Sequence, residues 1–209
     1  MSDIHGNSIA LDAVLSDIRS TGGVDEYWIL GDYVAIGPDP NGVLARLSSL
    51  PNASFTRGNT DRYVVTGERP APSLDDVKTN PALLPRLVNV CRSFAWTQGM
   101  VTAGGWYDWL SNLPLEKDAV LPGGTRVLAV HASPGRDDGP GYHPASDTNE
   151  LTELFLRTDY DLMFVGHTHT AIQTNLGHLT LVNLGSISNP LPPDLRASYV
   201  ICHAHSDGF

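Results

Sequence analysis

Residues 162–169 read Leu-Met-Phe-Val-Gly-His-Thr-His, an apolar run that ends in a glycine and two histidines. A short apolar run bounded by a glycine predicts a buried strand. Two histidines two residues apart, directly after such a strand, are hard to explain by packing, and imidazole is a common metal ligand. The segment therefore predicts a strand that delivers metal ligands at its carboxyl end.

Four further islands of oxygen or imidazole donors lie along the chain: Asp3-Ile4-His5, Gly31-Asp32, Gly58-Asn59 and His131. Taken alone, each has an ordinary explanation, because Asp and Asn often form caps or turns and a lone His is often a satisfied core residue. Strand-like runs at 27–30, 53–56 and 126–130 precede the last three islands. Together the five islands supply the roughly seven donors that a two-metal hydrolytic centre needs.

Composition narrows the class of protein. The 209 residues carry 13 basic and 23 acidic side chains, a net charge of −10. Nucleic acids and anionic membranes are bound mainly through Lys and Arg, so we expect neither as a partner. No apolar run approaches the roughly 20 residues of a membrane helix, and no signal-peptide pattern opens the chain. Cys91 and Cys202 could form one disulfide, but a reducing, cytoplasmic setting is the simpler interpretation.

The segments between the islands predict a single domain over residues 1–209. Helices are expected over 8–20, capped by Asn7 or Ser8, and over 41–50 and 150–157. Residues 62–114 interrupt the strand pattern with a loop to about residue 81 and helices near 83–91 and 106–110. We expect this insertion to cover the site as a cap. Short strands at 171–175, 179–183 and 198–202 indicate hairpins. An α/β sandwich of two sheets flanked by helices fits this order.

The first island begins at the third residue, so no strand precedes Asp3 in this sequence. A strand end is the natural place for such a ligand in an open α/β sheet. We therefore expect that an N-terminal strand is missing from the sequence and belongs upstream of it.

The five islands, in this order, resemble the motifs of the calcineurin-like metallophosphoesterase superfamily. Residues 2–7, 31–40 and 183–186 are similar to its small prokaryotic phosphodiesterase branch, which is related to diadenosine tetraphosphatases and protein phosphatases. The resemblance implies a four-layer α/β/β/α sandwich of two mixed sheets with a helical cap insertion. It also implies hydrolysis of small phosphate esters, most of all phosphodiesters, through attack by a metal-bridging hydroxide.

The same resemblance assigns roles to individual residues. The first metal ion would be held by Asp3, His5, Asp32 and His169, and the second by Asp32, Asn59, His131 and His167. The expected catalytic residues are Asp32, Asn59, Asp61 and His131, and the expected substrate-binding residues are Asn7 and Arg57. The mixed oxygen and nitrogen donors suit two divalent ions of Mn, Fe, Zn, Ni or Co, with Mn favoured.

One position departs from the family pattern. Many members carry a His directly after the Gly-Asn motif, where it can protonate the leaving oxygen, but this chain has Thr60 there, followed by Asp61. A Thr cannot act as a general acid near neutral pH, so we expect a preference for good leaving groups. Two alternatives stay open: a nucleotide or dinucleoside polyphosphate hydrolase or protein phosphatase on the same scaffold, and a protein-binding scaffold with weak catalysis. The oligomeric state is also open.

Overall fold

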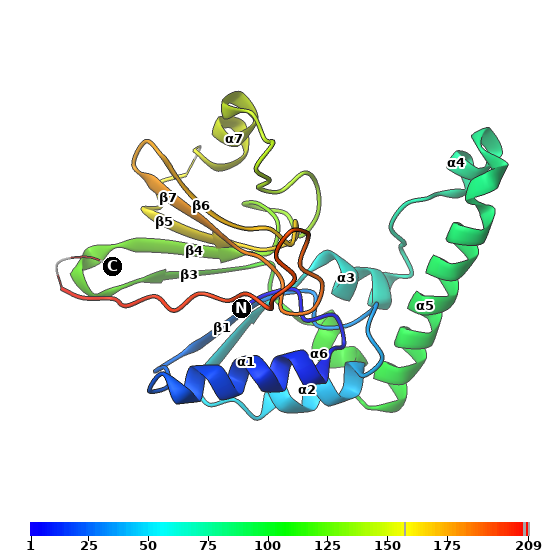
Figure 1. Cartoon of the computed structure of the whole chain (residues 1–209), viewed down its shortest axis with the longest axis horizontal. Coiled ribbons are helices and arrows are strands. Elements are labelled where there is room, and N and C mark those ends of the chain that lie inside the picture. The colour runs from blue at the N-terminus through cyan, green and yellow to red at the C-terminus, as the bar shows by residue number, and fades with distance from the viewer. Residues whose placement is uncertain (157, 207, 209) are drawn as a thin grey trace.

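Two β-sheets lie face to face between two layers of helices, in a computed structural model that describes residues 1–156, 158–206 and 208. The helices α1 (Ser8–Ser20) and α2 (Pro40–Ser48) cover one side, and α7 (Thr148–Phe155) covers the other (Figure 1). The expected four-layer α/β/β/α order is therefore confirmed.

The first sheet consists of the parallel strands β1 (Tyr27–Leu30) and β2 (Ala53–Thr56). Residues 1–3 run alongside β1: the N–H of Leu30 donates to the Met1 carbonyl at 2.9 Å, and the N–H of Asp3 donates to the Gly31 carbonyl at 3.2 Å. The chain then turns into α1, whose first turn is capped by the Asn7 side chain. This path places Asp3 next to the carboxyl end of β1.

The second sheet has the strand order β3-β4-β5-β7-β6. Its strands are β3 (Glu116–Val120), β4 (Arg126–Val130), β5 (Leu162–Val165), β6 (Ala171–Leu176) and β7 (Leu179–Leu184). The three central strands are parallel and both edge strands are antiparallel, so this sheet is mixed. Because β4 and β5 are parallel neighbours, the residues that follow them, His131 and Gly166, meet: the Gly166 N–H donates to the His131 carbonyl at 2.8 Å.

Three apolar cores fill the spaces between the four layers. Ile29 of β1 packs with α1 and α2, whereas the next residue, Leu30, faces the second sheet. Likewise Val127 of β4 faces the first sheet, and Leu128 packs with Phe155 of α7. Successive strand residues serve different cores because strand side chains alternate between faces. The short strands are therefore held from both sides, which fixes their carboxyl ends.

The insertion contains more helix than the sequence predicted. Its elements are α3 (Asn59–Thr66), α4 (Leu74–Thr79), the 3-10 turn η1 (Pro81–Leu83), α5 (Leu84–Ala103) and α6 (Tyr107–Ser111). The expected loop to residue 81 was wrong, because the Asp61 carboxylate accepts from the Gly58 N–H at the start of α3 and a capping box of Ser73 and Asp76 starts α4. α5 packs against α2 and α3 at one end, while its other end and α4 project from the body (Figure 1). A cap role for this segment stays a prediction.

One expected strand is absent, and one strand that was not expected is present. Residues 198–202 form no strand, because Ser198 alone bonds to the neighbouring 184–186 segment. β3 was not predicted, since its mostly polar sequence lacks the apolar signal of a buried strand. The helix expected over 150–157 is α7, and residue 157 lies outside the described residues.

Both cysteines are free and exposed. Within the part of the chain that the structure describes, no helix is both long and apolar enough for a membrane span.

Candidate metal centre

Five of the predicted ligands share an unusual backbone conformation. The φ angles of Asp3, His5, Asp32, His167 and His169 are 57°, 47°, 55°, 68° and 59°. Non-glycine residues rarely adopt this left-handed region, and strain of this kind persists where the surroundings hold it and is concentrated at functional sites. Here the first two islands hold each other: the N–H groups of Ile4 and His5 both donate to the Asp32 carbonyl at 2.9 Å.

A first group of donor atoms comes from Asp3, His5 and His169. The Asp3 Oδ1 and His169 Nε2 atoms are 3.1 Å apart, and the His5 and His169 Nε2 atoms are also 3.1 Å apart. The His5 Nε2 atom lies 3.8 Å from Asp3 Oδ1. Residues that are 164 positions apart in the chain thus present their donor atoms to one point.

A second group comes from Asp3, Asp32 and His131, and Asn59 and His167 adjoin it. The Asn59 Oδ1 atom lies 3.1 Å from His131 Nε2 and 3.0 Å from His167 Nδ1. The two Asp32 oxygens face different groups: Oδ2 lies 3.7 Å from His5 Nε2, and Oδ1 lies 3.5 Å from His131 Nε2. The two groups share Asp3. Asp32 also lies between them, because one of its oxygens faces His5 and the other faces His131.

Main-chain carbonyls fix the tautomers of three histidines. His131 Nδ1 lies 2.6 Å from the Leu30 carbonyl, His167 Nε2 lies 2.8 Å from the Gly139 carbonyl, and His169 Nδ1 lies 2.8 Å from the Asn189 carbonyl. A carbonyl can only accept, so each of these nitrogens carries the proton. In the neutral ring, the opposite nitrogen is left with a lone pair that points toward the donor groups. This arrangement is typical of metal-binding histidines.

The centre also fits a cation electrostatically. Asp3 Oδ1 is fully buried and forms no hydrogen bond of good geometry. Burial disfavours a charged His131, but the carboxylates of Asp32 and Asp3 outweigh burial and raise the pKa of the His131 imidazole to about 10. The site therefore attracts positive charge. Carboxylate, amide and imidazole donors together suit borderline divalent metals.

Gly166, directly after β5, allows the segment of residues 1–3 to approach closely. A Cβ atom at this position would lie 2.2 Å from Ser2 Oγ and 2.5 Å from Asp3 Oδ2. The N–H of the next residue, His167, donates to the same Asp3 oxygen at 3.1 Å. Any side chain at residue 166 would push Asp3 away from the histidines.

The other predicted site residues lie around the donor groups. Asp61 is buried and accepts hydrogen bonds from main-chain N–H groups, and a catalytic role for it stays a prediction. Arg57 is paired with Asp137 at 2.6 Å. Asn7 caps α1 and donates to Ser188 Oγ at 3.3 Å. Substrate contacts for Arg57 and Asn7 stay predictions.

Sequence reasoning missed the carbonyl partners of the histidines. Gly139 and Asn189 orient the histidines through their main-chain carbonyls, and the type of residue at a position does not indicate what its carbonyl binds. Asn183 also holds the histidine segment, since its Nδ2 donates to the Gly166 carbonyl at 2.9 Å and to Thr168 Oγ1 at 2.8 Å. The strand-end position of Asn183, in the segment that carried the family resemblance, was the available signal.

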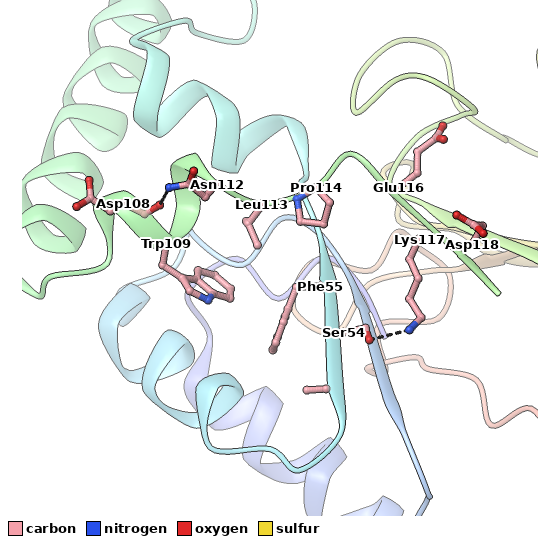
Figure 2. Close-up of a pocket in the computed structure, with 11 residues that line it drawn as sticks. Ser54, Phe55, Asp108, Trp109, Asn112, Leu113, Pro114, Glu116, Lys117 and Asp118 are labelled. Carbon is pink, nitrogen blue, oxygen red and sulfur yellow. Dashed lines mark hydrogen bonds between the residues drawn. The ribbon is translucent and has the colours of Figure 1, made fainter.

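Two surface hollows lie near these elements. One, of about 500 Å³, is lined by residues that include Arg57, Arg136 and Gly139, so it adjoins the partner of His167. The larger one, of about 730 Å³, lies at the edge of β2 between Trp109 of α6 and Lys117 of β3 (Figure 2). None of the residues that line the larger hollow belongs to the predicted ligand set. The smaller hollow is therefore the one relevant to the metal centre.

Comparisons with known proteins agree with this geometry. The family model of the calcineurin-like phosphoesterase superfamily domain matches residues 1–207. An uncharacterised protein of Methanocaldococcus jannaschii is 30% identical over 224 residues, which cover 96% of this chain and 80% of that protein. The crystal structure of a metallophosphoesterase from Sphaerobacter thermophilus is similar with a TM-score of 0.67 and 25% identity, covering 95% of this chain and 80% of that one. The symmetrical bis(5′-nucleosyl)-tetraphosphatase of Pectobacterium carotovorum is 31% identical over 88 residues, 39% of this chain and 31% of that enzyme.

Proposed function

Because this chain belongs to the calcineurin-like phosphoesterase superfamily, and is therefore a metal-dependent phosphoesterase, we propose that it is a dinuclear phosphodiesterase that acts on small substrates. One observation carries the proposal. Asp3, His5 and His169 form one group, and Asp3, Asp32 and His131 form another, and within each group the donor atoms lie within 4.8 Å of one another. Two overlapping groups of donors offer places for two ions.

The residues would divide between the ions as follows. The first ion would be held by Asp3, His5, Asp32 and His169, and the second by Asp32, Asn59, His131 and His167. When bound, the ions would supply a water-derived nucleophile at neutral pH and stabilise the charge that develops on the phosphoryl oxygens. The protein orients these donors in advance, because main-chain carbonyls already direct three of the four imidazoles.

The environment of Thr60 supports a preference for good leaving groups. Its hydroxyl donates to the Val34 carbonyl at 3.2 Å, and the residue is only 6% exposed. Thr60 cannot protonate an alkoxide leaving group as a general acid would. Protonation by a general acid typically raises the rate by about 10²–10⁴-fold. Aryl esters, diesters and phosphoanhydrides depend less on such a group than alkyl monoesters do.

The hollow beside Gly139 offers a place for the second substituent of a diester. Arg136 lines it and forms no ion pair with any described residue, so its guanidinium is free to contact an anionic substrate. An acidic chain surface disfavours a polyanionic nucleic acid in this role, and we expect a small phosphoester instead.

Turnover of bis-p-nitrophenyl phosphate in Mn²⁺ tests the proposal. Asp32→Ala and His131→Ala should each abolish hydrolysis, because each removes a donor that faces the centre. His143→Ala is the matched control, since His143 is exposed in a loop and, among the described residues, its Nδ1 accepts only from the nearby Ala145 N–H. A wild-type chain that binds Mn²⁺, Fe²⁺, Zn²⁺, Ni²⁺ or Co²⁺ but cleaves no phosphoester would instead favour a protein-binding scaffold. Equal turnover of an alkyl phosphomonoester and the aryl diester would contradict the leaving-group preference.

A dinucleoside polyphosphatase is the second candidate. The similarity to the symmetrical bis(5′-nucleosyl)-tetraphosphatase favours it, although that match covers 39% of this chain. A phosphoanhydride also carries a good leaving group, in keeping with Thr60. A kcat/KM for diadenosine tetraphosphate that exceeds the value for the aryl diester would decide for this candidate.

A further inference from the structure

The buried Asp137 carboxylate pairs with two partly exposed arginines close to the metal centre. It lies in the loop that follows His131, and its side chain is 6% exposed. Arg57 Nε donates to Asp137 Oδ2 at 2.6 Å. Arg62 Nε donates to both oxygens, at 3.0 Å and 3.1 Å. One carboxylate thus binds two guanidinium groups from another part of the chain.

The two arginines lie on either side of the predicted ligand Asn59. Arg57 follows β2, and Arg62 lies in α3, which begins at Asn59. The neighbouring Asp138 strengthens the connection, because it accepts from Arg62 Nη2 at 3.2 Å and from the Tyr63 hydroxyl. The start of α3 is therefore fastened to the loop at residues 137–139.

The same loop orients a second predicted ligand. The Gly139 carbonyl accepts from His167 Nε2 at 2.8 Å, so His167 Nδ1 is left with its lone pair, 3.0 Å from Asn59 Oδ1. These contacts run from Asn59 through Arg62, Asp137 and Gly139 to His167, and a second metal ion would close them into a ring, because the Nδ1 of His167 and the Oδ1 of Asn59 both present lone pairs to the same place. Each member of the ring limits the movement of the next.

The donors of the first group lie outside this ring. His169 is held by the Asn189 carbonyl, and the backbone of His5 is held by Asp32. Loss of Asp137 would therefore loosen Asn59 and His167 while it leaves the contacts of His5 and His169 in place.

We infer that Asp137 is a positioning residue for the second metal ion, which it serves by holding Asn59 and His167 in register. The inference rests on the proposed dinuclear function. It predicts a selective effect, in which one metal site weakens and the other does not. A residue with a merely structural role would lower thermal stability without such a difference between the sites.

Equilibrium dialysis of the full chain against Mn²⁺, with elemental analysis, separates these cases. Wild type should hold two ions per chain. In Asp137→Asn, one affinity should fall by about 10–100-fold, as is typical when the partner of a ligand is lost, and the other should be unchanged. Asp12→Asn is the matched control: Asp12 forms a similar two-bond pair with Arg46 on the surface, at 2.7 Å and 2.9 Å. Both affinities should survive that change.

Two outcomes would overturn the inference. If folded Asp137→Asn binds both ions as wild type does, Asp137 does not position the second site. If wild type holds fewer than two ions, the dinuclear proposal fails, and this inference fails with it. Should Asp137→Asn not fold, Arg62→Gln decides instead, because it cuts the ring on α3 while the Arg57–Asp137 pair remains. An unchanged pair of affinities in Arg62→Gln would then be the contradicting result.

Discussion

The Asp61 carboxylate accepts a hydrogen bond from the backbone N–H of Asp32 at 2.8 Å. The same oxygen accepts from the Gly58 N–H at 2.9 Å, and the other oxygen accepts from the N–H groups of Tyr33 at 3.0 Å and Val34 at 3.4 Å. All four donors are main-chain groups, so the Asp61 carboxylate stabilises the backbone around Asp32. It ties the start of α3 to the loop after β1 and helps to hold Asp32 in its left-handed conformation.

Asp61→Asn should therefore lower both stability and activity. The asparagine side chain replaces one carboxylate oxygen with an NH₂ group, which cannot accept a hydrogen bond from the main-chain N–H groups that face it. Those buried N–H groups lose their acceptor, at a cost of about 1–3 kcal/mol each. We expect the free energy of unfolding in urea to fall by about 2–4 kcal/mol. Asp76→Asn is the control, because Asp76 holds the equivalent position in the capping box of α4 but is exposed. Equal losses in the two variants would contradict the prediction.

Removal of metal should destabilise the fold. The buried carboxylates of Asp3 and Asp32 lie beside imidazoles, and a bound cation would compensate this concentration of donors. An ion at 100 times its Kd stabilises the folded chain by about 2.7 kcal/mol, which corresponds to roughly 5–10 °C in Tm for a chain of this size. Differential scanning calorimetry with and without EDTA measures the shift. Asp32→Ala should show a much smaller shift, and a wild-type Tm that EDTA does not change would refute the prediction.

The parts of the site that could be predicted from sequence are those that depend on side-chain identity. His167 and His169 follow an apolar run and a glycine, a pattern that packing alone does not explain. Asp61 also stood out as a neighbour of Asn59, and a catalytic role for it stays a prediction, but its contacts with main-chain N–H groups had no signal in the sequence. The reason is geometric, because helix α3 starts at Asn59 and turns the Asp61 side chain back toward the main chain of the β1 loop.

The parts that could not be predicted depend on the main chain and on tertiary partners. The Gly139 carbonyl orients His167, and a carbonyl has no sequence signature. Residues 198–202 have a strand-like composition, but no strand in the described part of the chain forms a ladder with them. β3 shows the opposite case, since a polar segment becomes a strand because β4 pairs with it along five residues. In each case a neighbour that is distant in sequence decides the local structure.

Thr60→Val should leave activity almost unchanged. Thr60 contacts the centre through its backbone N–H, which donates to Asp32 Oδ1 at 2.9 Å, and valine keeps that group. Only the hydroxyl bond to Val34 is lost, at a cost of about 1 kcal/mol of stability. We expect kcat/KM for bis-p-nitrophenyl phosphate to change by less than about 3-fold, against the roughly 10²–10⁴-fold that loss of a general acid typically causes. A decrease of about 100-fold or more would show that the hydroxyl takes part in the reaction.

Gly31→Ala should be far more damaging than its backbone conformation alone explains. Gly31 has a φ of 80°, and a Cβ there would lie 2.4 Å from the backbone nitrogen and 2.5 Å from the Cα of Gly58. Gly67 has nearly the same φ, 85°, but a Cβ there would meet nothing within 4 Å. Gly67→Ala should therefore cost only the left-handed penalty of about 1–2 kcal/mol.

The difference between the two alanine variants isolates the contact between the loops that carry Asp32 and Asn59. Gly31→Ala must push these loops apart, so it should cost more than Gly67→Ala by at least about 2 kcal/mol and should also weaken Mn²⁺ binding. Urea denaturation of both variants measures the first effect, and equilibrium dialysis measures the second. If the two variants lose the same stability and both bind Mn²⁺ as wild type does, the close approach of Gly31 and Gly58 does not hold the metal ligands together.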